Sequence, residues 1–181
     1  MNLETIAPAA DANAAADLVT RSGFHCHVRP VAVGDEAALA AFFAGVSSDD
    51  LRFRFLSGMD TVPEALIAGM THVDHRKTED FVVFEAGSDA IIANAMLAAD
   101  DKLDTAEVAI SIRKDLRGQG IGWTLLEHVA RYARARGIRK ICSIESHENH
   151  AAINLEREMG FTARPYDGDP SLVLLEASLR D

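Results

Sequence analysis

The alternation of apolar and polar positions predicts a series of short strands and helices after residue 23. The segment FHCHVRPV alternates and predicts a strand at Phe24–Arg29 that ends near Pro30. The segments DFVVFEA and AIIANAMLAA predict two strands joined by the turn GSD, and TAEVAISIRKD predicts a third strand of the same meander. Helical spacing of apolar residues in GDEAALAAFFAGVS, SDDLRFRFL and PEALIAGMTHV predicts helical segments between the first strand and the meander.

The second half of the chain alternates between strands and helices. In WTLLEHVARYARARG the apolar residues Leu126, Val129, Ala130 and Ala133 share one helical face, and Gly137 follows as a natural end of the helix. IRKICSIES predicts a strand, HAAINLEREMG a helix and SLVLLEASL a closing strand. This order, a hairpin meander followed by strand–helix–strand–helix, predicts an α+β (mixed α/β) fold with a partly antiparallel sheet.

The first 23 residues differ in composition from the rest of the chain. They are rich in alanine, and we expect an N-terminal arm over residues 1–23, with a short helix at Ala9–Thr20, outside a single domain of residues 24–181. The arm lacks both a basic start and a strongly apolar stretch, so it does not resemble a secretory signal. We therefore expect a cytoplasmic protein.

Composition narrows the classes of partner. Hydrophobic residues make up 48% of the 181 residues and charged residues 25%, which is typical of a globular domain with its own core. The formal net charge of −10 argues against nucleic acid as a partner, and no apolar run is long enough to span a bilayer. The acidic balance suits a cationic substrate, although solubility alone explains it as well. Cys26 and Cys142 lie in apolar stretches, which favours reduced, buried thiols over a disulfide.

The segment DLRGQGIGWTLL, residues 115–126, holds three glycines at alternate positions before a predicted helix. A Walker A loop is excluded because Trp123, followed by Thr124, stands where the motif requires a lysine. A dinucleotide fingerprint fails because its third glycine is absent at Trp123 or Leu125, whichever glycine starts the count. Two interpretations remain: a diphosphate held by backbone N–H groups at the helix N-terminus, or a tight turn that binds nothing.

The glycine segment resembles a known family. Arg117-Gly118-Gln119-Gly120-Ile121-Gly122 is similar to the R/Q-x-x-G-x-G/A signature of the GNAT superfamily of acyl-CoA-dependent N-acetyltransferases. SHENHAAINLEREMGF resembles the family's N-x-x-A…G-F segment through Asn149, Ala152, Gly160 and Phe161. VRPVAVGDEAALAAFFAGVSSDDLRFRFL resembles the opening of the Pat-type bacterial protein-lysine acetyltransferases. The resemblance covers Phe24 to about Leu175.

The resemblance implies a mixed, mostly antiparallel sheet flanked by helices and splayed in the middle to hold acetyl-CoA. The pyrophosphate would then lie on the amides of residues 118–122, and the strand edge near Ile110–Ile112 would pair with pantetheine. Asn149 can cap the helix that starts near His150, a role that Ser146 or His147 could take instead, and the resemblance implies that Asn149 also contacts the cofactor arm. The implied coenzyme-binding residues are Ile110, Ser111, Ile112, Arg117, Gly118, Gln119, Gly120, Ile121, Gly122 and Asn149.

The resemblance also assigns the chemistry. Glu107 matches the catalytic glutamate of the protein-acetylating branches and is the candidate general base; an ordinary solvent-facing strand glutamate is the alternative. Glu156 stands where many members carry a tyrosine that protonates the departing thiolate, and we expect it on the surface. A thiolate leaves tolerably unaided, since thiols ionise near pH 8.5. Nothing in the sequence places Tyr166 at the site.

The implied reaction is acetyl transfer from acetyl-CoA to a primary amine, by resemblance a protein lysine, through direct attack in a ternary complex. Residues 35–57 and 63–76 should form the groove for this cationic substrate, with an acidic set that could equally be a solvated face: Asp49, Asp50, Asp60, Glu64 and Asp74. The alternatives are a small-molecule amine as acceptor and a non-catalytic acyl-CoA sensor.

The remaining predictions concern metals and assembly. None of the histidine pairs His25/His27, His72/His75 and His147/His150 comes with the ligands of a recognisable zinc site, so we expect no metal. We expect a monomer or a homodimer.

Overall fold

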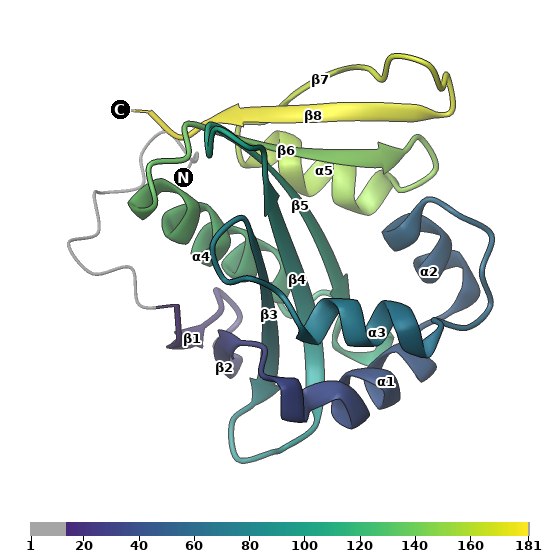
Figure 1. Cartoon of the computed structure of the whole chain (residues 1–181), viewed down its shortest axis with the longest axis vertical. Coiled ribbons are helices and arrows are strands. Elements are labelled where there is room, and N and C mark those ends of the chain that lie inside the picture. Colours follow the sequence, from purple (N-terminus) through teal and green to yellow (C-terminus); the bar gives the residue numbers. More distant parts are fainter. Residues whose placement is uncertain (1–13, 181) are drawn as a thin grey trace.

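An eight-stranded sheet with helices on both faces forms the body of the protein (Figure 1). The computed structural model describes residues 14–180. In sheet order the strands are β1 (Ala16–Val19), β2 (His25–Pro30), β3 (Thr78–Glu85), β4 (Ile91–Ala99), β5 (Thr105–Ile112), β6 (Lys140–Ser146), β8 (Leu172–Ser178) and β7 (Thr162–Pro165). Within residues 14–180, neighbouring strands are antiparallel except β5 and β6, which run parallel. The predicted α+β class is confirmed.

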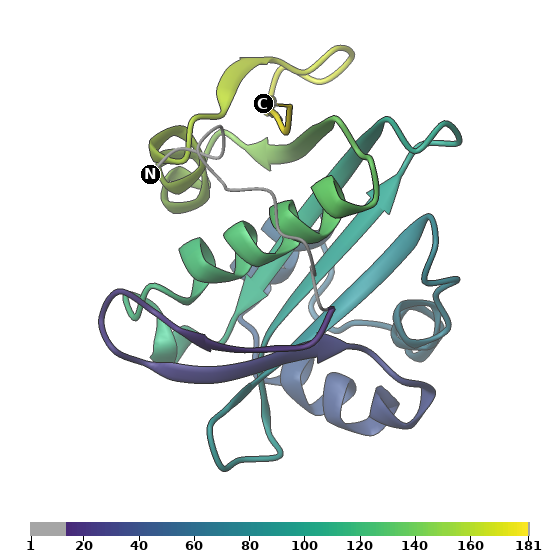
Figure 2. The same ribbon diagram turned by 90° about the vertical axis from the view of Figure 1, so that its left-hand side faces the viewer.

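In the described part of the chain five α-helices cover the sheet: α1 (Glu36–Ala44), α2 (Ser48–Phe55), α3 (Glu64–Thr71), α4 (Ile121–Ala135) and α5 (His150–Glu158). Buried residues of α4 and α5 join one apolar cluster with the central strands, whereas buried residues of α1, α2 and α3 join a second cluster. Figures 1 and 2 show α4 and the α1–α3 layer on opposite sides of the strands. The sheet is therefore enclosed between two cores.

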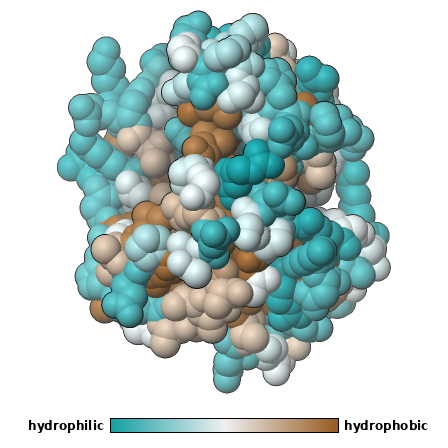
Figure 3. Space-filling view, turned by 90° about the vertical axis from the view of Figure 1, so that its right-hand side faces the viewer, coloured by the Kyte–Doolittle hydropathy of each residue, from teal (hydrophilic) through white to brown (hydrophobic). Residues whose placement is uncertain are grey.

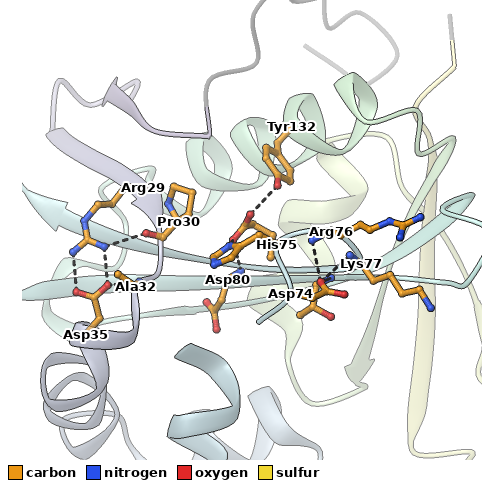
Figure 4. A network of polar contacts seen from close by, with 12 residues as sticks. Arg29, Pro30, Ala32, Asp35, Asp74, His75, Arg76, Lys77, Asp80 and Tyr132 are labelled. Atoms are coloured by element: carbon orange, nitrogen blue, oxygen red, sulfur yellow. Dashed lines mark hydrogen bonds and ion pairs between the residues drawn. The ribbon is translucent and has the colours of Figure 1, made fainter. Parts of the chain in front are cut away.

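Consecutive residues of β3 carry polar groups to opposite faces of the sheet, as strand geometry requires. On one face, buried Glu79 accepts a hydrogen bond from the Tyr132 hydroxyl on α4, at 2.8 Å. On the other, buried Asp80 accepts a bond from the side-chain amide of Asn94 on β4. Tyr132 and Asp80 lie on opposite sides of the strands in Figure 4. Asp80 is thus a buried acid beneath the α1–α3 layer.

The N-terminal arm corrects one prediction. Instead of a helix, Ala16–Val19 forms strand β1, antiparallel to β2 with Ala16 opposite Val28. Residues 1–13, which include the first part of the predicted helix, lie outside the described residues. The strand wins over the helical preference of alanine because pairing with β2 buries Leu18, which is 8% exposed. β7 was not predicted either; it is a short edge strand of four residues, and its final proline needs no ladder partner for an N–H group.

The sheet opens at its one parallel pair. β5 and β6 pair only over Thr105–Glu107 and Lys140–Cys142, although β5 continues to Ile112 and β6 to Ser146. Beyond Glu107 the two strands diverge, and the edge of β5 that faces β6 loses its strand partner. This confirms the predicted splay and places Glu107 at its apex.

No helix within residues 14–180 is both long enough and apolar enough to cross a bilayer.

Candidate active site

The divergence of β5 and β6 creates a cavity of about 630 Å³. Its walls come from β5, the glycine segment, the start of α4, the end of β6, α5 and the last turns of α2. Figure 3 views the α2 side of the molecule, where apolar patches interrupt the polar surface. A second, shallower hollow of about 760 Å³ lies between β2 and the β3–β4 turn, outside the splay. The cavity between β5 and β6 is the candidate site, because it gathers the predicted residues.

One wall is the free edge of β5. Val108 to Ile112 line the cavity along this edge, and Ser111 is 7% exposed. A strand edge offers alternating N–H and C=O groups to an extended ligand as it would to another strand. The amides of pantetheine fit this edge.

The glycine segment closes one end of the cavity, and its glycines have different tasks. Gly118 and Gly120 adopt φ of +79° and +78°, a left-handed conformation that strains other residues. Gly122 has an ordinary φ, but a Cβ there would lie 3.1 Å from Ile112 Cδ1 and 3.2 Å from Leu155 Cδ1. Two glycines therefore shape the turn, and the third lets α4 pack close to β5 and α5.

The turn delivers backbone donors at the mouth of α4. The first amides of a helix have no acceptor inside it, and they carry the positive end of the helix dipole. The Gln119 amide is already engaged, since it donates to the Leu116 carbonyl at 3.4 Å. A diphosphate would therefore accept hydrogen bonds from the backbone amides on either side of Gln119 rather than from the Gln119 amide.

Nearly all predicted site residues meet in the cavity. Those that line it are Glu107, Ile110, Ser111, Ile112, Arg117, Gly118, Gly120, Ile121, Gly122 and Asn149. Gln119 faces the β1–β2 turn instead, where the Ser22 hydroxyl donates to its carbonyl at 2.8 Å. Arg117 forms an ion pair with Asp50 of α2, so the loop is tied to the helix across the mouth.

Glu107 stands where the strands separate. Its side chain is accessible from the cavity, and its backbone is the last position of β5 to pair with β6, opposite Cys142. Partial burial raises the pKa of the Glu107 carboxyl, and the Arg54 guanidinium opposes the rise. A reachable carboxylate whose pKa is raised is suited to accept a proton near neutral pH.

Two further carboxyl groups lie on the β6–α5 side of the cavity. Glu145 accepts a hydrogen bond from the Asn149 side chain at 2.8 Å, and burial raises its pKa to about 7. Asn149 also caps α5, with its side-chain oxygen 3.5 Å from the Ala152 amide, as predicted.

The prediction that Glu156 lies on the surface is wrong. Its side chain is 5% exposed and lines the cavity, and the Ser143 hydroxyl bonds to its carboxyl. Burial, followed by the nearby charge of Glu145, raises its pKa to about 8. The sequence held a signal, since Glu156 follows buried Ile153 by three residues and so shares its helical face.

Arg54 was not predicted as a site residue. It lies in the last turn of α2, three residues after buried Leu51, and lines the cavity. Its Nε and Nη2 atoms are buried and have no hydrogen-bond partner among residues 14–180. A pattern of helical periodicity could have flagged a cation on the inward face of this helix.

The other predicted candidates are dispersed. Of the acidic set only Asp50 lines the cavity; Asp74 instead accepts bonds from the amides of residues 76–78. His150 lines the cavity, but Tyr166 does not. Within the described chain, His, Cys, Asp and Glu side chains form no group of three or more that could hold a metal ion. Both cysteines are free thiols.

Comparison with known proteins decides the family. The model of the acetyltransferase (GNAT) family matches residues 47–161, which span α2 to the end of α5 and contain the whole glycine segment. The chain belongs to the GNAT acetyltransferase family. GNAT members transfer an acetyl group from acetyl-CoA to an amine, and this N-acetyltransferase shares their fold.

Individual proteins similar to this chain are also acetyltransferases. An acetyltransferase of Pseudomonas aeruginosa is 27% identical over 159 residues, 87% of this chain and 86% of that protein. The GNAT domain of S. lividans PAT superimposes with a TM-score of 0.84 at 28% identity, covering 91% of this chain and 97% of the domain. The spermidine N-acetyltransferase of Vibrio cholerae, solved with CoA and spermine, shares the fold with a TM-score of 0.70 at 20% identity, covering 85% and 95% of the chains.

The cavity of this GNAT acetyltransferase fits a CoA thioester. The free β5 edge suits the pantetheine amides, and the helix-end amides suit the pyrophosphate. Gly122 lacks a Cβ where one would press against two cavity-lining side chains, Ile112 and Leu155. The residues that would hold the coenzyme are therefore those of β5, the glycine segment and the start of α5.

Proposed function

We propose that this enzyme transfers the acetyl group of acetyl-CoA to the side-chain amine of a protein lysine, with Glu107 as the general base. The observation that carries the proposal is the position of Glu107 at the apex of the splay. A thioester carried along the β5 edge would bring its carbonyl close to this carboxylate.

The chemistry follows from the protonation of the acceptor. A lysine amine is almost fully protonated at neutral pH, because its pKa is about 10.4. Glu107 accepts one proton, the free amine attacks the thioester carbonyl, and a tetrahedral intermediate forms. A backbone N–H of the β5 edge would donate to the developing oxyanion. The C–S bond then breaks, the thiolate leaves, and the second amine proton is released as the amide forms.

The charges around the cavity support a cationic acceptor. Asp50 and Glu148 line the cavity but are paired with Arg117 and Arg52. Glu107 and Glu145 line it outside any ion pair among the described residues and are the carboxyl groups that can receive a cation. The assignment to lysine rests on the resemblance of residues 28–56 to the Pat-type enzymes and on the likeness to the GNAT domain of S. lividans PAT.

The test is the substitution Glu107→Gln, which keeps the shape of the side chain and removes its basicity. We expect kcat for acetylation of lysine peptides to fall about 10²- to 10⁴-fold near neutral pH, with nearly unchanged affinity for acetyl-CoA. Thiol release measures turnover and calorimetry measures affinity. Glu85→Gln, which changes an exposed glutamate on β3, is the matched control.

Two results would contradict the proposal. Activity of Glu107→Gln within about threefold of the wild type would show that Glu107 is not the general base. Binding of acetyl-CoA without release of the CoA thiol in the presence of any amine would favour a sensor. Faster thiol release with small amines than with lysine peptides would favour a small-molecule acceptor.

A further inference from the structure

Arg54 places a buried cation beside the reacting groups, and the reaction as described does not use it. Its guanidinium reaches the cavity from α2, which packs against β5. Nε and Nη2 are buried and without a hydrogen-bond partner among the described residues. An arginine is never neutral in a protein, so a positive charge lies beneath the surface here without a bonded counter-ion.

Other charged groups at the mouth of the cavity are already paired. Arg117 pairs with Asp50, and Arg52, the exposed arginine two residues before Arg54, donates to Glu148 at 2.7 Å. Direct contact neutralises much of the charge of each partner in such pairs. Arg54 forms no such ion pair among the described residues, so its charge acts on the carboxyl groups around it at longer range.

Three carboxyl groups from three strands interact electrostatically with this cation: Asp80 of β3, Glu107 of β5 and Glu145 of β6. Burial raises the pKa of each, to about 7 for Asp80 and Glu145, and Arg54 opposes the rise in all three. Glu145 is further raised by the charge of Glu107. Without the cation, these groups would favour their neutral forms together.

The remaining neighbours of Glu107 supply no unpaired cation among the described residues. Its partner on β4 is Ala98, and its partner on β6 is Cys142, whose pKa is raised to about 11 by burial and then by Glu107 itself. Lys140 and Arg164 also act on Cys142, but both form ion pairs with Glu176 of β8. Glu156 of α5 lies beyond Glu145 and adds only a further carboxyl group.

We propose that Arg54 is a positioning residue that keeps Glu107 ionised, and therefore able to accept the proton of the amine, at neutral pH. The proposal rests on the assignment of Glu107 as the base and adds the group that controls it. Arg54 acts through the carboxylate and need not touch the substrate.

The pH dependence of turnover tests the proposal. Removing the charge raises the pKa of Glu107, so the acid limb of the kcat/KM profile should move to higher pH. For Arg54→Gln we expect a shift of about one pH unit: about tenfold less activity than the wild type at pH values below the wild-type acid limb, and activity within about threefold at pH 9. Titration of the amine itself is common to both proteins and cancels in their ratio.

Two variants complete the experiment. Arg54→Lys retains the charge and should keep the limb within about 0.3 pH units of the wild type. Arg52→Gln changes a neighbouring arginine of the same helix that is already paired, and should leave the profile in place. Titration of the Glu107 carboxyl carbon by NMR, assigned through its loss in Glu107→Gln, reports the same shift without turnover.

The outcomes separate this inference from the proposed function. An equal loss at every pH in Arg54→Gln, or a shift in Arg54→Lys as large as that expected for Arg54→Gln, would overturn the role of Arg54. If Arg54→Gln does not fold, Arg54→Met, which keeps the aliphatic stem and removes the charge, takes its place in the profile and in the NMR titration, with the same expected shift. If Glu107→Gln remains active, the assignment of Glu107 as the base is wrong. If Glu107→Gln is inactive while Arg54→Gln keeps the acid limb of the wild type, only the role of Arg54 is wrong.

Discussion

A buried carboxyl group in the cavity keeps its proton at neutral pH, whereas carboxyl groups on the surface are ionised. Glu156 is the clearest case, because burial and Glu145 raise its pKa to about 8 from an ordinary value of 4.5. The chain thereby keeps a neutral acid where many GNAT members carry a tyrosine, while Glu107 remains reachable from the cavity. Neighbouring carboxyl groups thus differ in charge because their surroundings differ.

The raised pKa of Glu156 predicts how stability changes with pH. The folded state favours the protonated acid, so its contribution is complete below about pH 4.5 and is lost as pH rises through 8. Glu156→Gln should therefore increase the free energy of unfolding at pH 9 by on the order of 2 kcal/mol, and change it little at pH 5. Denaturant unfolding at both pH values measures this.

Glu158→Gln on the same helix is the control, because Glu158 is exposed. A Glu156→Gln protein that is less stable at pH 9 than at pH 5, by the same margin as the wild type, would show that this carboxyl is ionised in the folded protein.

At the scale of elements, two short segments converge on the cavity. The glycine segment turns β5 into α4, and α2 brings Arg54 and Asp50 over the β5 edge. α2 begins with the Ser47 hydroxyl, which accepts from the Asp50 amide at 3.3 Å, and ends at Leu56 in a left-handed conformation. The N-cap at Ser47 and the left-handed residue Leu56 fix both ends of α2, and with them the positions of its charged residues.

A substitution at Gly122 tests the effect of close packing without adding backbone strain. Because its φ is ordinary, Gly122→Val adds bulk against Ile112 and Leu155 without a left-handed penalty. Both neighbours line the cavity, so their displacement should raise the Kd for CoA about tenfold, measured by calorimetry.

Gly34→Ala is the control, since its added Cβ would meet nothing within 4 Å and its φ is ordinary. Unchanged CoA affinity in Gly122→Val would mean that the helix start can retreat without disturbing the coenzyme. The same change at Gly120 is less informative, since its φ of +78° adds strain.

At the scale of the whole molecule, the site exists because one sheet divides into two. β1 to β5 form one half and β6, β8 and β7 the other, and three residue pairs join them. The β1–β2 hairpin supports the glycine segment from outside: Ser22 donates to Gln119, and the Arg21 guanidinium lies 4.1 Å from the centre of the Trp123 ring. The described part of the N-terminal arm, from residue 14, therefore packs against the glycine segment.

Binding of CoA should change the thermal stability of the protein and its hydrogen exchange. CoA at about 100 times its Kd should stabilise the protein by about 2.7 kcal/mol, seen as a higher Tm. Hydrogen exchange should slow at residues 108–112 and 117–123, where amides are expected to donate to the ligand, and remain unchanged in β7. Slowed exchange confined to the hollow between β2 and the β3–β4 turn would place the coenzyme elsewhere.

The sequence determined much of the fold and of the coenzyme end. Periodicity located α4 and its end at Gly137, the β3–β4 hairpin and the closing strand, because these signals are local and agree with burial. The spacing of Gly118, Gly120 and Gly122 marked a backbone that must bend and approach closely, which is also a local property.

Only the tertiary structure decided the rest. The strand at Ala16–Val19 depends on a partner ten or so residues away, which outweighs the helical preference of alanine. The burial of Glu156, and the meeting of Arg54 with Asp80, Glu107 and Glu145, come from elements far apart in the chain that pack together. The charge of a carboxyl group depends on what surrounds it in space, and that is set by the assembled fold rather than by its neighbours in sequence.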